Sequence, residues 1–85
     1  MGGATVDELK RLRSLIDRVD GGIVRLLEER MRLCREIARV KEELGVPLED
    51  PVREEEVLRS KGEWREVFRV IVELCKREQA RVTGS

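Results

Sequence analysis

Apolar residues recur at every third and fourth position through the first half of the chain. The series, which we call the seam, is Leu9, Leu12, Ile16, Val19, Ile23, Leu26, Arg30, Leu33, Ile37, Val40 and Leu44. This spacing is typical of an amphipathic helix that packs against other helices. Arg30 is the one charged member. Because a buried guanidinium is costly without a partner, we expect Arg30 to face an anion.

The seam predicts one long helix from Thr5 to Leu44. Thr5 and Glu8 can form a capping box at its start, and a glycine directly after Leu44 is typical of a helix end. The pair Gly21-Gly22 weakens the helix interior. Since the seam keeps its phase across this pair, we predict one continuous helix. Whether it bends at the two glycines stays open. Two antiparallel helices are the alternative interpretation.

Two shorter helices are expected after a linker. Asp50 followed by Pro51 indicates an N-cap and a first-turn proline, which starts a helix over 51–60 with a thin apolar face of Val52, Val57 and Leu58. A third helix is predicted over 63–82. Its apolar stripe is Trp64, Phe68, Ile71, Cys75, Gln79 and Val82. We therefore predict a single all-α domain over residues 5–82, with three helices.

The helix lengths predict an intertwined homodimer. A helix of 40 residues is ~60 Å long, whereas a compact domain of 85 residues is only ~30–35 Å across. The two shorter helices can cover part of the seam. We expect the uncovered part to pair with a second copy of the chain.

The amino-acid composition excludes or disfavours several classes of function. Eighteen basic residues balance 18 acidic ones, which argues against a nucleic-acid-binding module. The chain has no histidine, so histidine-based acid–base chemistry is excluded and most metal sites are disfavoured. Neither a membrane span nor a secretory signal is evident. Cys34 and Cys75 lack metal-ligand spacing, and we expect them to be small buried thiols of a cytoplasmic protein.

Polar residues gather on the predicted helix faces. On the long helix, Arg30, Cys34, Ile37 and Lys41 share one stripe. On the second helix, Asp50, Arg53, Glu54 and Val57 share a face, and the third helix adds Gln79. Each residue alone has a structural explanation, as a snorkelling arginine, an end-of-helix lysine, a cap, a surface pair or a core amide. The set together favours a binding site for a small anion.

These residues stand in an order that resembles the all-helical class of chorismate mutase. The matching stretches are Leu12-Arg13-x-x-Ile16-x-x-Val19-Asp20, Leu26-Leu27-x-x-Arg30, Ile37-Ala38-x-x-Lys41, Pro47-x-x-Asp50-x-x-Arg53-Glu54, and Phe68-x-x-Ile71-Val72-Glu73 with Gln79. One difference is that the second helix and its connection to the third helix are shorter than we expect for this family. The resemblance implies a Claisen rearrangement of chorismate to prephenate on the route to Phe and Tyr, with no cofactor or metal.

The resemblance also implies roles for individual residues. Arg13 and Arg30 would bind the two substrate carboxylates, assisted by Arg53. Lys41 and Gln79 would hydrogen-bond the ether oxygen of the breaking bond. Asp50 and Glu54 would hold the substrate hydroxyl and the lysine. Cys75 falls where the family lines its site with a small residue, and so could touch substrate.

The positions of two arginines favour the same dimer. Arg13 lies 17 residues before Arg30, or ~25 Å along one helix, so the two cannot hold one small dicarboxylate within a chain. An antiparallel partner helix would bring them together. Two other interpretations stay open: an isochorismate pyruvate-lyase-like enzyme on the same scaffold, and a helical dimerisation module without activity, in which Arg30 sets the register.

Overall fold

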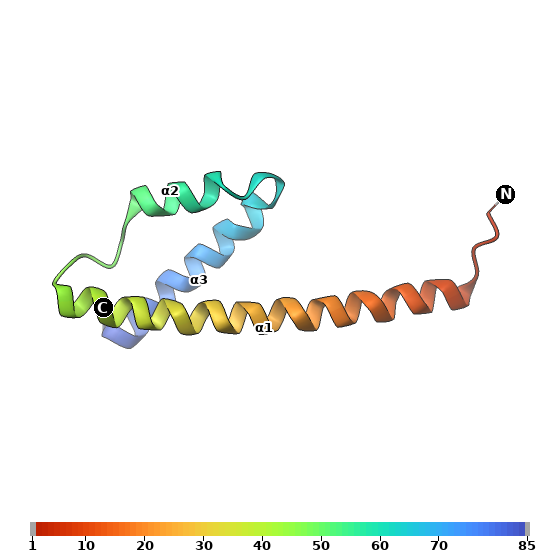
Figure 1. The fold of residues 1–85 in the computed structure, drawn as a ribbon, viewed down its shortest axis with the longest axis horizontal. Coiled ribbons are helices and arrows are strands. Elements are labelled where there is room, and N and C mark those ends of the chain that lie inside the picture. The colour runs from red at the N-terminus through yellow and green to blue at the C-terminus, as the bar shows by residue number, and fades with distance from the viewer. Residues whose placement is uncertain (1, 85) are drawn as a thin grey trace. The chain divides into compact units, whose positions relative to one another are not determined.

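The computed structural model describes residues 2–84 of the chain. It contains α1 (Val6–Leu44), α2 (Pro51–Arg59), a short 3-10 helix η1 (Gly62–Trp64) and α3 (Arg65–Thr83) (Figure 1). The predicted all-α fold with one long, one short and one medium helix is confirmed. The chain forms two compact units, one ending at Arg30 and one beginning at Met31, with α1 contributing to both.

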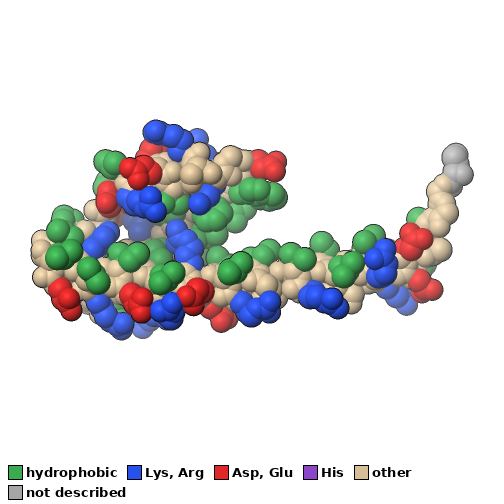
Figure 2. All heavy atoms as spheres, viewed as in Figure 1, with side chains coloured by type: hydrophobic (Ala, Val, Ile, Leu, Met, Phe, Trp, Pro, Cys, Tyr) green, Lys and Arg blue, Asp and Glu red, His purple; other side chains and the backbone are tan. Residues whose placement is uncertain are grey.

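The first unit consists mainly of the N-terminal part of α1. Thr5 caps the helix, since its Oγ1 accepts a hydrogen bond from the backbone N–H of Glu8 at 3.1 Å. The helix continues through Gly21 and Gly22 without interruption, so the prediction of one continuous helix is confirmed. Figure 2 shows apolar side chains along one edge of α1 and charged ones along the other. None of the described residues of this unit is buried.

The second unit contains the end of α1, together with α2 and α3. Gly45 follows α1 with a φ of 70°, the left-handed conformation that glycine adopts most readily at a helix C-terminus. The side chain of Asp50 then caps α2 by accepting from the N–H of Arg53 at 3.1 Å. Pro51 occupies the first turn, where its missing N–H costs nothing. The predicted helix boundaries therefore hold to within a few residues.

The core of the second unit is small. Its buried apolar residues come from all three helices and are Cys34, Ala38, Leu58, Ile71 and Val72. Two residues that we expected on the apolar faces, Val52 and Trp64, are exposed. Trp64 belongs to η1, and a 3-10 helix turns every three residues. Its side chain is therefore out of phase with the stripe of α3.

The prediction of two free cysteines was wrong, because Cys34 of α1 and Cys75 of α3 form a disulfide. Their Cα atoms are 5.8 Å apart although 41 positions separate them in the sequence. Such proximity depends on how the helices pack, and the spacing of the two cysteines in the sequence does not predict it. Closing a loop of this length removes conformational entropy from the unfolded chain and stabilises the fold by roughly 4 kcal/mol. That is a large contribution for a domain with so few buried side chains.

The face of α1 that packs inside the second unit is not the seam. Seam residues Leu33, Ile37 and Val40 are 43–52% exposed, whereas Ala38 is 0% exposed. Cys34 and Ala38 each follow a seam residue by one position, which rotates them by about 100° around the helix. Our expectation that the shorter helices cover part of the seam was therefore wrong. They cover the adjacent face, and the seam stays accessible over both units.

Candidate functional site

Gln79 is the one polar residue that is buried among the described residues, with 6% of its surface exposed. Its Nε2 donates a hydrogen bond to the backbone oxygen of Cys34 at 3.2 Å. A side-chain amide nitrogen carries two protons, so this bond leaves one for another acceptor. Gln79 is thus a neutral donor whose position is fixed by α1.

Lys41 lies in the last turn of α1 and is half-buried. Its Nζ donates to the backbone oxygen of Leu48 at 2.8 Å. This contact ties the end of α1 to the linker before α2. An ammonium group has three protons, so Lys41 also keeps donors for a ligand. Its side chain is therefore anchored, unlike a fully solvated lysine at a helix end.

A pocket of about 450 Å³ adjoins these two residues. Its lining residues are Pro47, Leu48, Glu49, Lys76, Gln79 and Ala80. Gln79 itself lines the pocket, and Lys41 binds the backbone of Leu48 in its wall. The pocket therefore combines the neutral amide donor of Gln79 with the ammonium group of Lys76. Both donors suit a small ligand with oxygen acceptors.

Lys76 is a pocket residue that sequence reasoning missed. Its Nζ lies 3.3 Å from a carboxylate oxygen of Glu54, 3.4 Å from Glu73 and 3.5 Å from Glu49. These carboxylates, Glu54 foremost through its hydrogen bond, raise the pKa of Lys76. The resemblance implies that Glu54 pairs with Lys41, but in this structure Glu54 forms an ion pair with Lys76. The one available signal was that Lys76 stands three residues after Glu73 and three before Gln79, on one face of α3.

Asp50 and Arg53 occupy the start of α2. Asp50 acts as the helix cap. The guanidinium of Arg53 lies 3.4 Å from Glu56, and 69% of its side chain is exposed. Such an exposed pair is weak, so the Arg53 side chain can exchange Glu56 for another anion at little cost. Both residues occur where the sequence predicted them, at the beginning of the second helix.

A charged cluster lies next to Gln79 and joins α1 to α3. Arg35 of α1 contacts Glu78 at 3.1 Å, and Glu78 also accepts hydrogen bonds from Arg81. The two guanidinium groups, Arg81 first, lower the pKa of Glu78 from 4.5 to about 2. Glu78 therefore remains charged at any ordinary pH. It holds α3 against α1 one residue away from the buried amide.

The predicted site residues divide between the two units. Arg13 and Arg30 belong to the first unit, where Arg13 is exposed and Arg30 is half-buried. The second unit contains the other six, which are Lys41, Asp50, Arg53, Glu54, Cys75 and Gln79. Cys75 is engaged in the disulfide, so it offers a sulfur atom rather than a thiol. Its predicted contact with substrate stays a prediction.

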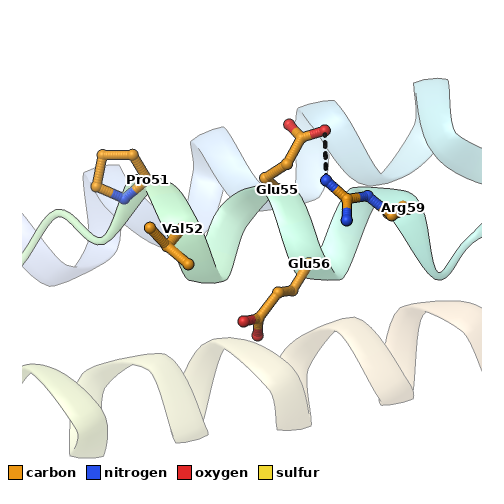
Figure 3. A pocket seen from close by; sticks show the side chains of 5 residues that line it. All are labelled: Pro51, Val52, Glu55, Glu56 and Arg59. Atoms are coloured by element: carbon orange, nitrogen blue, oxygen red, sulfur yellow. Dashed lines mark ion pairs between the residues drawn. The ribbon is translucent and has the colours of Figure 1, made fainter.

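A second depression lies on the surface of α2 (Figure 3). It is lined by Pro51, Val52, Glu55, Glu56 and Arg59, with an ion pair of 3.8 Å between Glu55 and Arg59. None of the predicted site residues lines it. Its side chains are exposed, whereas the pocket beside Gln79 includes a buried amide donor. The pocket beside Gln79 is the better candidate.

Residues 2–84 contain neither a metal-binding cluster nor a membrane-spanning helix. No cluster of three or more His, Cys, Asp and Glu side chains in this range could hold a metal ion. No helix in the same range is long and apolar enough to cross a membrane.

Comparison with known proteins identifies the family. Residues 12–80 match the family described as chorismate mutase type II, and this range includes every predicted site residue. The chain belongs to the chorismate mutase type II family. The match to this family confirms the resemblance seen in the sequence motifs, and it agrees with the all-α fold.

Two curated proteins are similar to parts of this chain. The chain is 42% identical over 71 residues to a 3-dehydroquinate dehydratase of Pyrobaculum aerophilum, covering 84% of this chain and 24% of that protein. It is 39% identical over 49 residues to a chorismate mutase of Methanocaldococcus jannaschii, covering 58% and 50%. The chain therefore spans half or less of these curated relatives.

A solved structure has nearly the same length. A conserved hypothetical protein from Pyrococcus furiosus is 47% identical and superimposes with a TM-score of 0.83, over 91% of this chain and 99% of that one. This chain therefore shares its fold with that protein over nearly the full length of both chains.

Proposed function

We propose that this chain is a chorismate mutase that catalyses the Claisen rearrangement of chorismate to prephenate, an intramolecular isomerisation. The observation that carries the proposal is the buried Gln79 amide, which is anchored to Cys34 and faces a pocket in a member of the chorismate mutase type II family. A buried amide with one unused proton suits an acceptor supplied by a ligand. The ether oxygen of the breaking bond is such an acceptor.

Catalysis would depend on conformation and on fixed donors. A rearrangement within one molecule needs no nucleophile, and the site lowers the barrier by holding the folded conformer of the substrate. Gln79 and Lys41 would donate to the ether oxygen, where negative charge develops in the transition state. Donors that are already held in place, by Cys34 and by Leu48, stabilise that charge without reorganising during the reaction.

The carboxylates of the substrate would be bound by arginines. Arg30 is half-buried on α1, and Arg53 has only an exposed ion pair to give up. Asp50 and Glu54 would hold the substrate hydroxyl and Lys41. Glu54 is partnered by Lys76 in this structure, so we expect Lys76 to share Glu54 with Lys41 when substrate is bound.

The working form would be a homodimer in which each site takes Arg13 from the partner copy. The exposed seam supports this proposal. Its six aliphatic members between Leu9 and Leu26 are 45–72% exposed, and they form a continuous apolar row of the kind that pairs with another helix. An antiparallel partner would also bring its Arg13 towards Arg30, which the length of α1 prevents within one chain.

The cytoplasmic location expected from the sequence stays a prediction. It is supported by the proposed substrate, which is an intermediate of amino-acid biosynthesis. The disulfide argues against a cytoplasmic location, because disulfides persist in a cytosol only in particular organisms or proteins. Cell fractionation followed by detection of the chain in each fraction would test the prediction.

The proposed function is tested by measuring chorismate consumption together with the size of the protein. We expect the wild-type chain to form prephenate. The variant Arg30→Ala should lose turnover by about 100-fold or more, because it removes a charged contact to the substrate, while its helicity and size persist. Arg32→Ala is the matched control, since Arg32 is an exposed arginine of α1 outside the predicted site, where it pairs with Glu36, and it should keep nearly full activity.

Two results would contradict the proposal. Retained activity in Arg30→Ala would overturn the site assignment. If the wild-type chain neither consumes chorismate nor binds a dicarboxylate transition-state analogue, the mutase interpretation fails. An assay with isochorismate then distinguishes the lyase-like enzyme from the dimerisation module.

A further inference from the structure

Helices α1 and α3 are joined by three side-chain links within a short stretch. The first is the Cys34–Cys75 disulfide, the second is the bond from Gln79 to the oxygen of Cys34, and the third is the Arg35–Glu78 ion pair. On α1 these links use two consecutive residues. The contact between the two helices is therefore concentrated beside the buried amide.

The disulfide and the buried amide share the same anchor. Cys34 contributes its sulfur to the disulfide and its backbone oxygen to the hydrogen bond of Gln79. On α3, Gln79 follows Cys75 by four residues, which places both on the same face, one turn apart. The covalent bond therefore fixes the spacing of the helices one turn away from the amide that depends on it.

Among the described residues, side-chain packing of α1 contributes little to the distance between α1 and α3. Cys34 and Ala38, the buried residues of α1, are both small, and no large side chain in the described part of the chain is fully buried. The ion pair between Arg35 and Glu78 is partly exposed and can adjust its length. In a well-packed core, interdigitated side chains would hold the helices. Here the disulfide takes that role.

From this arrangement we infer that the Cys34–Cys75 disulfide is a positioning element for the Gln79 amide, so that its reduction lowers turnover more than substrate affinity. The inference rests on the proposed function for its kinetic readout. A donor that acts on charge developing in the transition state affects kcat when it is displaced, and it leaves KM nearly unchanged. Small displacements of such a group are costly.

The experiment compares oxidised and reduced protein. Dithiothreitol donates two electrons and two protons, the S–S bond breaks to give the thiols of Cys34 and Cys75, and the reagent closes to its cyclic disulfide. Thiol labelling measures the extent of reduction, and circular dichroism checks that the chain remains folded at the assay temperature. We expect kcat to fall about tenfold, with KM changing by less than about threefold.

Three variants separate positioning from general stability. Cys34→Ala/Cys75→Ala should show the lower kcat without reductant and should not respond to it. Gln79→Ala should have low activity before reduction. Reduction should cause no further loss in this variant, because the group that the disulfide positions is gone. Arg35→Gln, the matched control, breaks another α1–α3 link. It should lower the thermal midpoint while leaving kcat within about twofold of wild type.

A readout without substrate distinguishes failure of this inference from failure of the proposed function. In 15N-labelled protein, the side-chain amide signals of Gln79 should shift and exchange faster after reduction, and they should be unchanged in Arg35→Gln. The inference is overturned if those signals do not change in fully reduced, folded protein. It is also overturned if an active enzyme keeps its kcat on reduction, or if reduction lowers kcat equally in Gln79→Ala.

Discussion

The two units of this chain use the same kind of helix in different ways. In the first unit, α1 has no buried residue among those described, and its apolar seam is exposed. In the second unit, α1 supplies Cys34 and Ala38 to a core shared with α2 and α3. The same helix thus has one stretch that contributes to a core and one stretch, among the described residues, that does not.

The difference shows where each unit obtains its stability. The second unit combines a small core with a disulfide, a buried hydrogen bond and an interhelical ion pair. Residues 2–30 of the first unit include a helix cap but no buried side chain, and an isolated helix in water is marginally stable. We infer that the first unit depends on a partner for its stability, and the proposed dimer would supply that partner.

The largest effect should come from a charge in the seam of the first unit. Ile16→Glu would place a carboxylate in the proposed dimer contact of both copies, where it cannot be solvated. We expect dissociation to monomers, loss of helix from the first unit and a loss of activity of about 100-fold, since Arg13 would no longer reach the partner's site. Analytical ultracentrifugation, circular dichroism and the chorismate assay measure these changes.

Arg18→Glu is the control for this charge, because Arg18 lies outside the seam on the charged side of α1. It should leave the size and activity nearly unchanged. A dimer of full helicity in Ile16→Glu would show that the first unit is stable without the seam contact.

A smaller effect is expected from acid in the second unit. The pKa of Glu78 is about 2 in the folded chain against an ordinary 4.5. A group with a lowered pKa stabilises the fold above its ordinary pKa, and this contribution is lost as the pH falls from about 4.5 towards 2. Thermal unfolding across this range should show a falling midpoint. Glu78→Gln should show a smaller fall, and an identical fall in both proteins would contradict the role of Glu78.

The smallest effect should come from replacing glycines by alanine. The change in the free energy of unfolding should have opposite signs in the two units. At Gly21 and Gly22 an added methyl group would meet only the side chain of Arg25. Alanine there should stabilise the helix by about 1 kcal/mol per substitution. At Gly62, with a φ of 58°, alanine should destabilise by a similar amount. Chemical denaturation measures each change. A loss at Gly21 or Gly22 would indicate close approach of a partner helix.

Much of the secondary structure could be predicted because its causes are local. The cap at Thr5, the glycine after Leu44 and the Asp50-Pro51 start of α2 each act within one turn of the chain. The candidate site was also anticipated in part, since Lys41, Glu54 and Gln79 all belong to the unit that holds the pocket. Lys76 was missed because its role depends on carboxylates from the linker and from α2.

The sequence by itself determined the helices, the capping residues and the apolar seam, since these depend on neighbours a few positions apart. The tertiary structure alone decided which face of α1 is buried, that Cys34 meets Cys75, and that Glu54 pairs with Lys76. The face that packs against α3 is lined by small residues, Cys34 and Ala38, which a search for large apolar residues passes over. Contacts across 22 to 45 positions depend on how the helices pack, and helix periodicity does not encode that packing.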